Sequence, residues 1–260
     1  MTVTSRHTPT PRRGREVADL TAYDAVLFDL DGVLTPTAEV HMRAWKTMFD
    51  ELFDEAGIRP DYTDDDYFRF VDGKKRYEGV VGVLRDRGIE VPWGDPADPI
   101  AADTVCGIGN RKNAVFARLL REHGVAPFPG SLRMLSRLRA SGTPMAVVSS
   151  SKNAEEVLHA AGIRDFFPVV VDGVVAERED LPSKPAPDVF ARAAELLGVP
   201  VTLTAAVEDA TSGVAAAAAA GCRFVLGIDR GAGARALHDA GADVVVSDLS
   251  DPLTPNRGDS

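Results

Sequence analysis

Short apolar runs alternate with segments of helical spacing along most of the chain. The apolar runs lie at residues 25–31, 144–150, 167–173, 203–209, 223–229 and 242–248. From residue 144 onward, segments such as 153–162 and 186–198 have apolar positions at helical spacing and end in glycine, as helices commonly do. Strands that alternate with helices predict an α/β fold with a doubly wound, Rossmann-like parallel sheet.

The interval 35–128 interrupts this alternation. Its pattern is mostly helical, as in 39–57 and 111–124, and it is too long to be a loop. We therefore expect a helical cap domain over 35–128, inserted into a core domain formed by 23–34 and 129–248. The alanine run 215–220 predicts a helix packed closely on the sheet. The polar ends of the chain, 1–22 and 249–260, predict disordered tails.

Composition restricts the class of protein. The 260 residues are 45% hydrophobic and carry a net charge of -10, which argues against nucleic-acid binding through a basic face. No apolar run reaches the ~18 residues of a membrane span, and the N-terminal segment has no apolar core of a secretory signal. Cys106 and Cys222 have no metal-ligand spacing and predict a reducing compartment. We expect a cytoplasmic monomer or weak dimer.

Two aspartates in "AVLFDLDGVLT" raise the first chemical question. Asp31 and Gly32 are typical of a turn that closes a strand, but Asp29 lies inside the apolar run, where an unpaired carboxylate is costly. Side chains two apart on a strand face the same side, so two like charges would repel unless a cation lay between them. The pattern indicates either a structural turn or a carboxylate site for a hard cation such as Mg²⁺.

Further polar residues follow other predicted strands, where open α/β sheets hold their ligands. Ser149 to Asn153 follow the second strand, and Glu208 and Asp209 follow a later one. A serine before a helix can hold phosphate, and Lys184 in "SKPAPD" adds a cation. Each feature alone also occurs in helix caps and solvated surfaces, but together they indicate a phosphate and metal site.

The segments "DLDGVLT", "VVSSSKN", "SKPAPD" and "VEDATSGV", in this order, resemble the four motifs of the haloacid dehalogenase superfamily, with the cap inserted as in its helical-cap members. The segments "TAEVHMRAWK", "RKN" at 111–113 and "SSSKN" resemble the β-phosphoglucomutases within that superfamily. The resemblance spans about residues 23–248.

The resemblance implies roles for the core residues. Asp29 becomes the nucleophile that forms an aspartyl-phosphate, and Asp31 becomes the general acid and base. Ser149 and Lys184 would neutralise the transferring phosphoryl group. Mg²⁺ would be bound by the residues Asp29, Asp31 (through its main-chain carbonyl), Glu208 and Asp209.

The resemblance also implies residues that bind a phosphorylated sugar. A mutase needs a second phosphate site because its bisphosphate intermediate turns round between two transfers. Candidate residues for substrate binding and cap closure are Thr37, His41, Trp45, Arg76, Lys112, Ser150, Ser151, Lys152 and Asn153. Closure matters because a phosphorylated aspartate open to water makes the protein a phosphatase.

Two features depart from the family pattern. Pro36 occupies a hinge position where such enzymes usually have Asp, and the middle of the cap, 90–110, is longer than we expect. The resemblance implies a mutase that interconverts β-glucose 1-phosphate and glucose 6-phosphate through glucose 1,6-bisphosphate. One alternative is a phosphatase of sugar phosphates or other small metabolites. The other is a non-catalytic sugar-phosphate sensor, but a sensor could lose Asp29 without harm, whereas every chemical residue is intact in this sequence.

Overall fold

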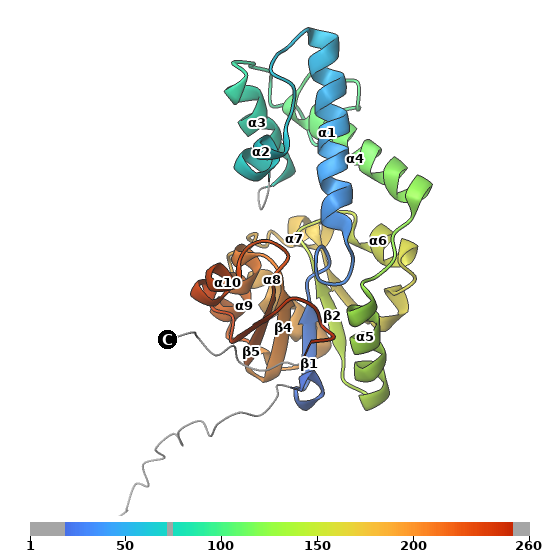
Figure 1. Cartoon of the computed structure of the whole chain (residues 1–260), viewed down its shortest axis with the longest axis vertical. Coiled ribbons are helices and arrows are strands. Elements are labelled where there is room, and N and C mark those ends of the chain that lie inside the picture. The colour runs from blue at the N-terminus through green and yellow to red at the C-terminus, as the bar shows by residue number, and fades with distance from the viewer. Residues whose placement is uncertain (1–18, 72–74, 252–260) are drawn as a thin grey trace, which may run out of the picture.

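A parallel sheet forms the centre of the computed structural model, which describes residues 19–71 and 75–251 (Figure 1). The strands are β1 (Ala25–Phe28), β2 (Met145–Val148), β3 (Val169–Val171), β4 (Thr204–Glu208), β5 (Phe224–Ile228) and β6 (Val244–Val246). They lie in the order β3-β2-β1-β4-β5-β6, and every neighbouring pair is parallel. The predicted α/β fold with a doubly wound parallel sheet is confirmed.

Helices cover both faces of this sheet. They are α5 (Pro129–Ser141), α6 (Ala154–Ala160), α7 (Gly173–Arg178), α8 (Asp188–Leu197), α9 (Thr211–Ala220) and α10 (Ala234–Ala240). Leu27 of β1 faces a cluster formed with α8, α9 and α10, whereas Val26 and Phe28 face a second cluster that includes α5 and α6. The alternation arises because successive strand residues point to opposite faces. The predicted alanine-rich helix is α9, and its Ala216 and Ala217 are buried against the sheet.

The chain between β1 and α5 forms further helices beyond the carboxyl ends of the strands (Figure 1). These cap helices are α1 (Thr37–Ala56), α2 (Asp64–Asp66), a π-helical turn (Tyr67–Val71), α3 (Arg76–Asp86) and α4 (Val105–His123). Two connections join them to the rest of the fold, one from β1 and one to α5. We call residues 29–36 the first linker and residues 124–128 the second linker.

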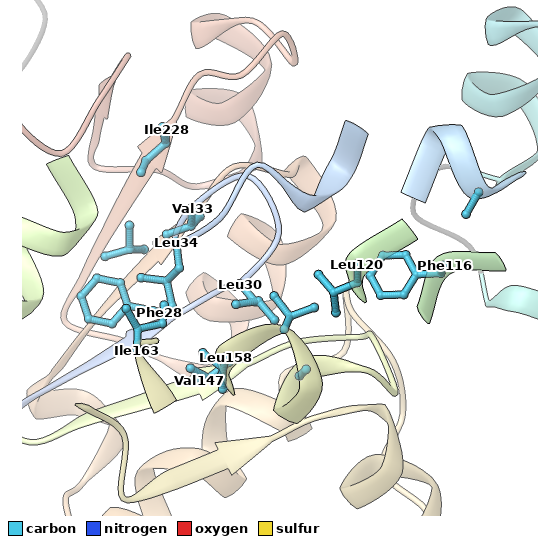
Figure 2. Packing of buried hydrophobic residues seen from close by; sticks show 14 of the residues in the cluster. Phe28, Leu30, Val33, Leu34, Phe116, Leu120, Val147, Leu158, Ile163 and Ile228 are labelled. Atoms are coloured by element: carbon cyan, nitrogen blue, oxygen red, sulfur yellow. The ribbon is translucent and has the colours of Figure 1, made fainter. Parts of the chain in front are cut away.

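The apolar core of the sheet continues through the first linker into the cap helices (Figure 2). Leu30 of the first linker is fully buried, and Figure 2 shows it between Val147 and Leu158 on the sheet side and Leu120 on α4. Burial of each such side chain stabilises the fold by roughly 1.5–3 kcal/mol relative to exposure. The first linker is therefore packed as part of the core, which limits where the residues beside Leu30 can lie.

The end of β1 and the inner ends of both predicted tails are among the sequence-based boundaries that differ from the structure. β1 ends at Phe28 rather than at residue 31, because Gly32, with φ of 81°, turns the chain directly after the aspartates. The 3-10 turn Leu20–Ala22 and Leu249 lie within the predicted tails, but Leu20 and Leu249 are buried, so the tails were placed too far into the folded chain. Residues 1–18 and 252–260 of those tails lie outside the described residues.

The remaining short elements are the 3-10 turns Arg164–Phe166 and Val201–Leu203. Within residues 19–71 and 75–251, none of the helices combines the length and the apolar character needed to cross a bilayer.

Candidate active site

The carboxyl ends of β1, β2 and β4 bring together polar residues that are far apart in the sequence. β1 lies between β2 and β4, so Asp29, which follows β1, has Ser149 on one side and Glu208 on the other. All three residues are buried, and at most 7% of the surface of each is exposed. The sheet topology therefore places the predicted nucleophile at the centre of the predicted site.

Lys184 joins the residues at these strand ends. Its Nζ donates to Asp29 Oδ1 at 2.6 Å, to Glu208 Oε1 at 2.5 Å and to the carbonyl oxygen of Val148 at 2.9 Å. Burial disfavours the charged ammonium, but the two carboxylates outweigh burial and raise the pKa of Lys184. The lysine is therefore a fixed positive charge at the strand ends.

One lysine does not balance the carboxylates around it. Burial raises the pKa of Asp29 and raises that of Glu208 to about 7, although Lys184 acts in the opposite direction on both. Burial, together with the charges of Asp29 and Glu208, raises the pKa of Asp209 to about 9. Buried like charges are costly unless a cation compensates them.

The same three carboxylates, Asp29, Glu208 and Asp209, can act as ligands to one ion, because each offers an oxygen within 4.8 Å of the others. Carboxylate oxygens are the ligands that Mg²⁺ prefers, and a divalent cation would relieve the repulsion that raises the pKa values of Glu208 and Asp209. The donor set and the excess of negative charge both fit a hard divalent cation.

Two glycines allow the backbone to pass close to these carboxylates. A Cβ atom at Gly32 would lie 1.9 Å from Asp209 Oδ2, and a Cβ atom at Gly213 would lie 1.9 Å from Glu208 Oε1. Neither contact is possible for a side chain without displacing a carboxylate. Gly32 also has a positive φ, which other residues rarely adopt. The turn "DG" and the segment "SGV" thus need glycine for reasons of space at the site.

Asp31 is connected to the cap helices through side chains of α1. Thr37 Oγ1 donates to Asp31 Oδ1, and His41 Nε2 lies 3.8 Å from the same oxygen. Burial and the nearby charge of Asp29 raise the pKa of Asp31 to about 6, while the hydrogen bond from Thr37 lowers it. A carboxyl group with a pKa near neutrality can both give and take a proton, as a general acid and base must.

Lys112 of α4 extends this connection. Its Nζ lies 2.7 Å from His41 Nδ1 and above the rings of Trp45 and Phe116, at 5.2 and 5.1 Å from their centroids. Burial and the charge of Arg76 lower the pKa of Lys112 to about 7. Trp45 is itself buried, at 4% exposed, and its ring contacts Lys112, which links it to the other residues predicted to bind substrate.

Arg76 and Asn153, which were predicted to bind a second phosphate, share one acceptor. Arg76 Nη2 donates to Asn113 Oδ1 at 3.1 Å, and Asn153 Nδ2 donates to the same oxygen at 2.7 Å. Arg76 belongs to α3 and Asn113 to α4, whereas Asn153 precedes α6 on the sheet side. This shared oxygen therefore joins cap and core where the second phosphate site was expected.

The other residues of the segment 150–153 do not share a common contact with the cap helices. Ser151 Oγ accepts from the Asn153 amide at 3.2 Å, and Ser149 Oγ accepts from the Ser151 amide at 3.0 Å. Lys152 Nζ contacts Glu177 at 2.6 Å in a partly exposed ion pair, and Ser150 is exposed. The structure thus places Arg76 and Asn153 together and directs Lys152 to a different partner.

The family model described as a haloacid dehalogenase-like hydrolase matches residues 23–221 of this chain. The chain belongs to this family. It is 50% identical over 238 residues to the β-phosphoglucomutases of Mycobacterium bovis and Mycobacterium tuberculosis, covering 88% of this chain and 91% of theirs. It is 32% identical over 233 residues to the β-phosphoglucomutase of Bacillus subtilis, covering 87% and 90% of the two chains.

Solved structures of haloacid dehalogenase-like proteins have the same architecture. The β-phosphoglucomutase of Clostridium difficile superposes with a TM-score of 0.70 at 25% identity, covering 87% of this chain and 92% of that one. The CbbY protein of Rhodobacter sphaeroides, in complex with phosphate, superposes with a TM-score of 0.69 at 26% identity, covering 88% and 96%. Family membership identifies the chain as an enzyme rather than a non-catalytic sensor.

Buried Lys112 gives this haloacid dehalogenase-like enzyme a testable dependence of stability on pH. The pKa of lysine is near 10.4 in an unfolded chain and is lowered to about 7 in the folded state. Between these two pH values the unfolded state binds more protons, so this lysine makes the protein more stable as pH rises. We expect Lys112→Met to raise Tm by at least about 2 °C at pH 6.5, with a difference that shrinks toward pH 10.

Thermal unfolding of wild type and Lys112→Met between pH 6 and pH 10 checks this expectation. Lys46→Met is the matched control, because Lys46 is an exposed lysine of α1 that pairs with Asp50. A Lys112→Met variant whose Tm differs from wild type by the same amount at every pH would contradict the lowered pKa.

Asn113 is the functional candidate that sequence reasoning missed. It lies in the segment "RKN", which carried part of the family resemblance, but only Lys112 was selected from it. No sequence pattern singles out Asn113, because its contacts are with Arg76 and Asn153, which are 37 and 40 positions away along the chain. Nearby, the long middle of the cap is fixed by Asn110, whose Nδ2 donates to the carbonyl oxygens of Pro96 and Asp98.

Proposed function

We propose that this enzyme is a Mg²⁺-dependent β-phosphoglucomutase, which interconverts β-glucose 1-phosphate and glucose 6-phosphate. The 50% identity to mycobacterial β-phosphoglucomutases over most of both chains carries the proposal. The site supports it, because a buried nucleophile, an acid-base residue and an arginine linked to the second phosphate segment lie between the sheet and the cap helices.

Asp29 accepts and returns the phosphoryl group. The phosphorylated Asp29 transfers the group to the 6-hydroxyl of β-glucose 1-phosphate, which gives glucose 1,6-bisphosphate and frees the carboxylate. After the bisphosphate turns round, a carboxylate oxygen of Asp29 bonds to the phosphorus at position 1, and the bond from that phosphorus to the sugar oxygen breaks. Glucose 6-phosphate leaves, and the phosphorylated aspartate is restored for the next cycle.

Asp31 handles the proton in both transfers. It takes the proton of the 6-hydroxyl in the first transfer and gives it to the sugar oxygen at position 1 in the second, so the proton count closes over one cycle. Its pKa of about 6 suits both roles. The hydrogen bond from Thr37, the first residue of α1, ties the position of this carboxylate to the position of the cap helices.

The transferring phosphoryl group is held by charges that are already in place. Lys184 Nζ contacts Asp29 at 2.6 Å, and Ser149 follows β2, the strand beside β1, so these two residues would neutralise or hydrogen bond the phosphoryl oxygens. Mg²⁺, when bound by the carboxylates of Asp29, Glu208 and Asp209 and by the main-chain carbonyl of Asp31, supplies the remaining positive charge. Phosphoryl transfer depends mainly on such positioning and electrostatic stabilisation.

A phosphatase of sugar phosphates is the second candidate. The structural neighbour CbbY favours it, because it superposes well and its structures contain phosphate or xylulose-1,5-bisphosphate. The same Asp29 and Asp31 would serve, with water in place of the sugar hydroxyl as the acceptor. The two functions differ in whether the non-reacting phosphate of a bisphosphate must be held while the sugar turns round.

Replacement of Arg76 separates the two candidates. We expect Arg76→Ala to lower mutase turnover by about 100-fold, because a charge-assisted contact to phosphate is worth roughly 1.5–3 kcal/mol. Hydrolysis of acetyl phosphate, which engages only the Asp29 side of the site, should fall less than about threefold. Both rates are measured on one preparation, by coupled detection of glucose 6-phosphate and by release of inorganic phosphate.

Arg85→Ala is the matched control, since Arg85 is an exposed arginine of the same helix, α3. It should leave both rates at wild-type values. If Arg76→Ala lowers both activities equally, Arg76 supports only folding or closure, and if it lowers neither, the phosphatase candidate becomes the better one.

A further inference from the structure

The first linker is held by three separate donors at three successive carbonyl groups. Arg230 Nε donates to the carbonyl of Gly32 at 2.9 Å, Ser131 Oγ donates to that of Val33 at 2.6 Å, and the Phe128 amide donates to that of Leu34 at 2.9 Å. Two of these donors belong to the second linker and the start of α5. Arg230 comes from the segment that follows β5, which ends at Ile228.

Arg230 also contacts the second linker and the end of the sheet. Its guanidinium carbon lies 4.0 Å from the centroid of the Phe128 ring, and its Nη1 donates to the carbonyl of Ser247 at 3.0 Å. Nη2 lies 3.5 Å from Asp248 Oδ2. One planar side chain thus joins both linkers to the segment that follows β6, in the fork geometry that lysine cannot reproduce.

The carbonyl that Arg230 holds is close to the reacting groups. Gly32 directly follows Asp31, and its Cα faces Asp209 so closely that a Cβ atom would lie 1.9 Å from the carboxylate. The Gly32 amide donates to the carbonyl of Thr35 within the same linker at 2.8 Å. A displacement of Gly32 therefore shifts the neighbouring Asp31 and changes the distance from the backbone to the Asp209 carboxylate. Arg230 itself contacts neither aspartate.

We propose that Arg230 is a positioning residue that clamps the two linkers to the sheet and so holds Asp31 in place and the cap helices in register with Asp29. The clamp favours transfer to the sugar hydroxyl over transfer to water, because the sugar must be oriented by the cap whereas water need not be. This expected effect on the ratio of sugar transfer to hydrolysis rests on the proposed mutase function. The clamp itself does not depend on that function.

The variant Arg230→Met tests the clamp, since it keeps an unbranched apolar stem beside Phe128 and removes every donor. We expect glucose 6-phosphate formation to fall by at least about tenfold, because small misplacements of reacting groups are costly. The ratio of released phosphate to glucose 6-phosphate should rise, and Arg230→Lys should recover only part of the loss. Arg139→Met is the matched control, because Arg139 lies over the ring of Phe166 at 3.5 Å, away from both linkers.

Amide hydrogen exchange provides a readout that does not depend on the reaction. Peptides that contain Gly32 and Phe128 should exchange at least about tenfold faster in Arg230→Met than in wild type, while peptides from β1 and β4 keep their protection. Unchanged exchange at both linkers would overturn the clamp, as would equal losses of transfer and hydrolysis together with faster exchange throughout the sheet.

The two proposals fail in different ways. Wild-type enzyme that forms no glucose 6-phosphate would end the proposed mutase function, and the exchange of the linker amides would still decide whether Arg230 clamps them. Wild-type enzyme that forms glucose 6-phosphate, with an Arg230→Met variant of unchanged product ratio and unchanged linker exchange, would overturn the clamp alone.

Discussion

Asp29→Asn is expected to abolish turnover, with a loss of at least about 10⁴-fold. The amide cannot form an acyl phosphate, and it keeps the size of the carboxylate it replaces. The fold should be retained and even stabilised, because burial raises the pKa of Asp29 and its charge also raises the pKa of Asp209. The measurement is steady-state turnover, together with thermal unfolding of the same sample.

Asp24→Asn is the matched control for this variant, since Asp24 is exposed at the opposite end of β1. It should retain wild-type activity. An Asp29→Asn enzyme that turns over at a rate near wild type would rule out the covalent mechanism, whatever its stability.

Asp31→Asn is the second large effect, with an expected loss of about 10² to 10⁴-fold in turnover. The amide cannot exchange a proton with the sugar oxygens, but the main-chain carbonyl that would bind Mg²⁺ remains. A substrate with a good leaving group needs no acid, so acetyl phosphate should still phosphorylate Asp29. We therefore expect a single burst of one phosphoryl group per chain, followed by very slow release of phosphate.

Rapid-quench measurement of protein-bound phosphate distinguishes these steps. If the burst disappears together with turnover, Asp31 is needed for the structure or metal affinity of the site and not specifically for proton transfer. If turnover stays at the wild-type rate, Asp31 contributes only its carbonyl group.

The fold could be predicted because its signal is local. Each strand is a short apolar run ended by polar residues, and the order of strands and helices fixes a parallel sheet. The exact ends were less predictable, since Asp29 continues the apolar run although β1 stops at Phe28. Within the cap, the short polar helix α2 and the π-helical turn Tyr67–Val71 have no periodic pattern from which they could be predicted.

The core of the site could be predicted for a related reason. Parallel strands end at the same edge of a sheet, so Asp29, Ser149 and Glu208 had to meet once their strands were recognised. Lys184 was selected as a compensating cation beside these polar groups, although a lone lysine in a proline-rich loop is usually solvated, and the family resemblance then implied its role. The order of the four motifs along the chain supported the role of Lys184, which the positions of the strands alone did not indicate.

The contacts between cap and core could not be predicted from sequence. Arg230 and Gly32 are 198 positions apart, and neither lies in a motif that pairs them. Asn113 likewise joins α3 to the segment before α6 through one oxygen. Such contacts depend on how two layers pack, and packing is set by the whole core rather than by local pattern. Lys152, which was predicted to bind phosphate, contacts Glu177 through its Nζ, and its role at a second phosphate site stays a prediction.

The most direct test of the proposed function is an assay of the wild-type enzyme with Mg²⁺, β-glucose 1-phosphate and a catalytic amount of glucose 1,6-bisphosphate. Glucose 6-phosphate and inorganic phosphate are followed together by ³¹P NMR. A mutase whose cap excludes water should convert β-glucose 1-phosphate almost completely to glucose 6-phosphate, with little inorganic phosphate. Stoichiometric release of inorganic phosphate with no glucose 6-phosphate would contradict the proposal and identify the enzyme as a phosphatase.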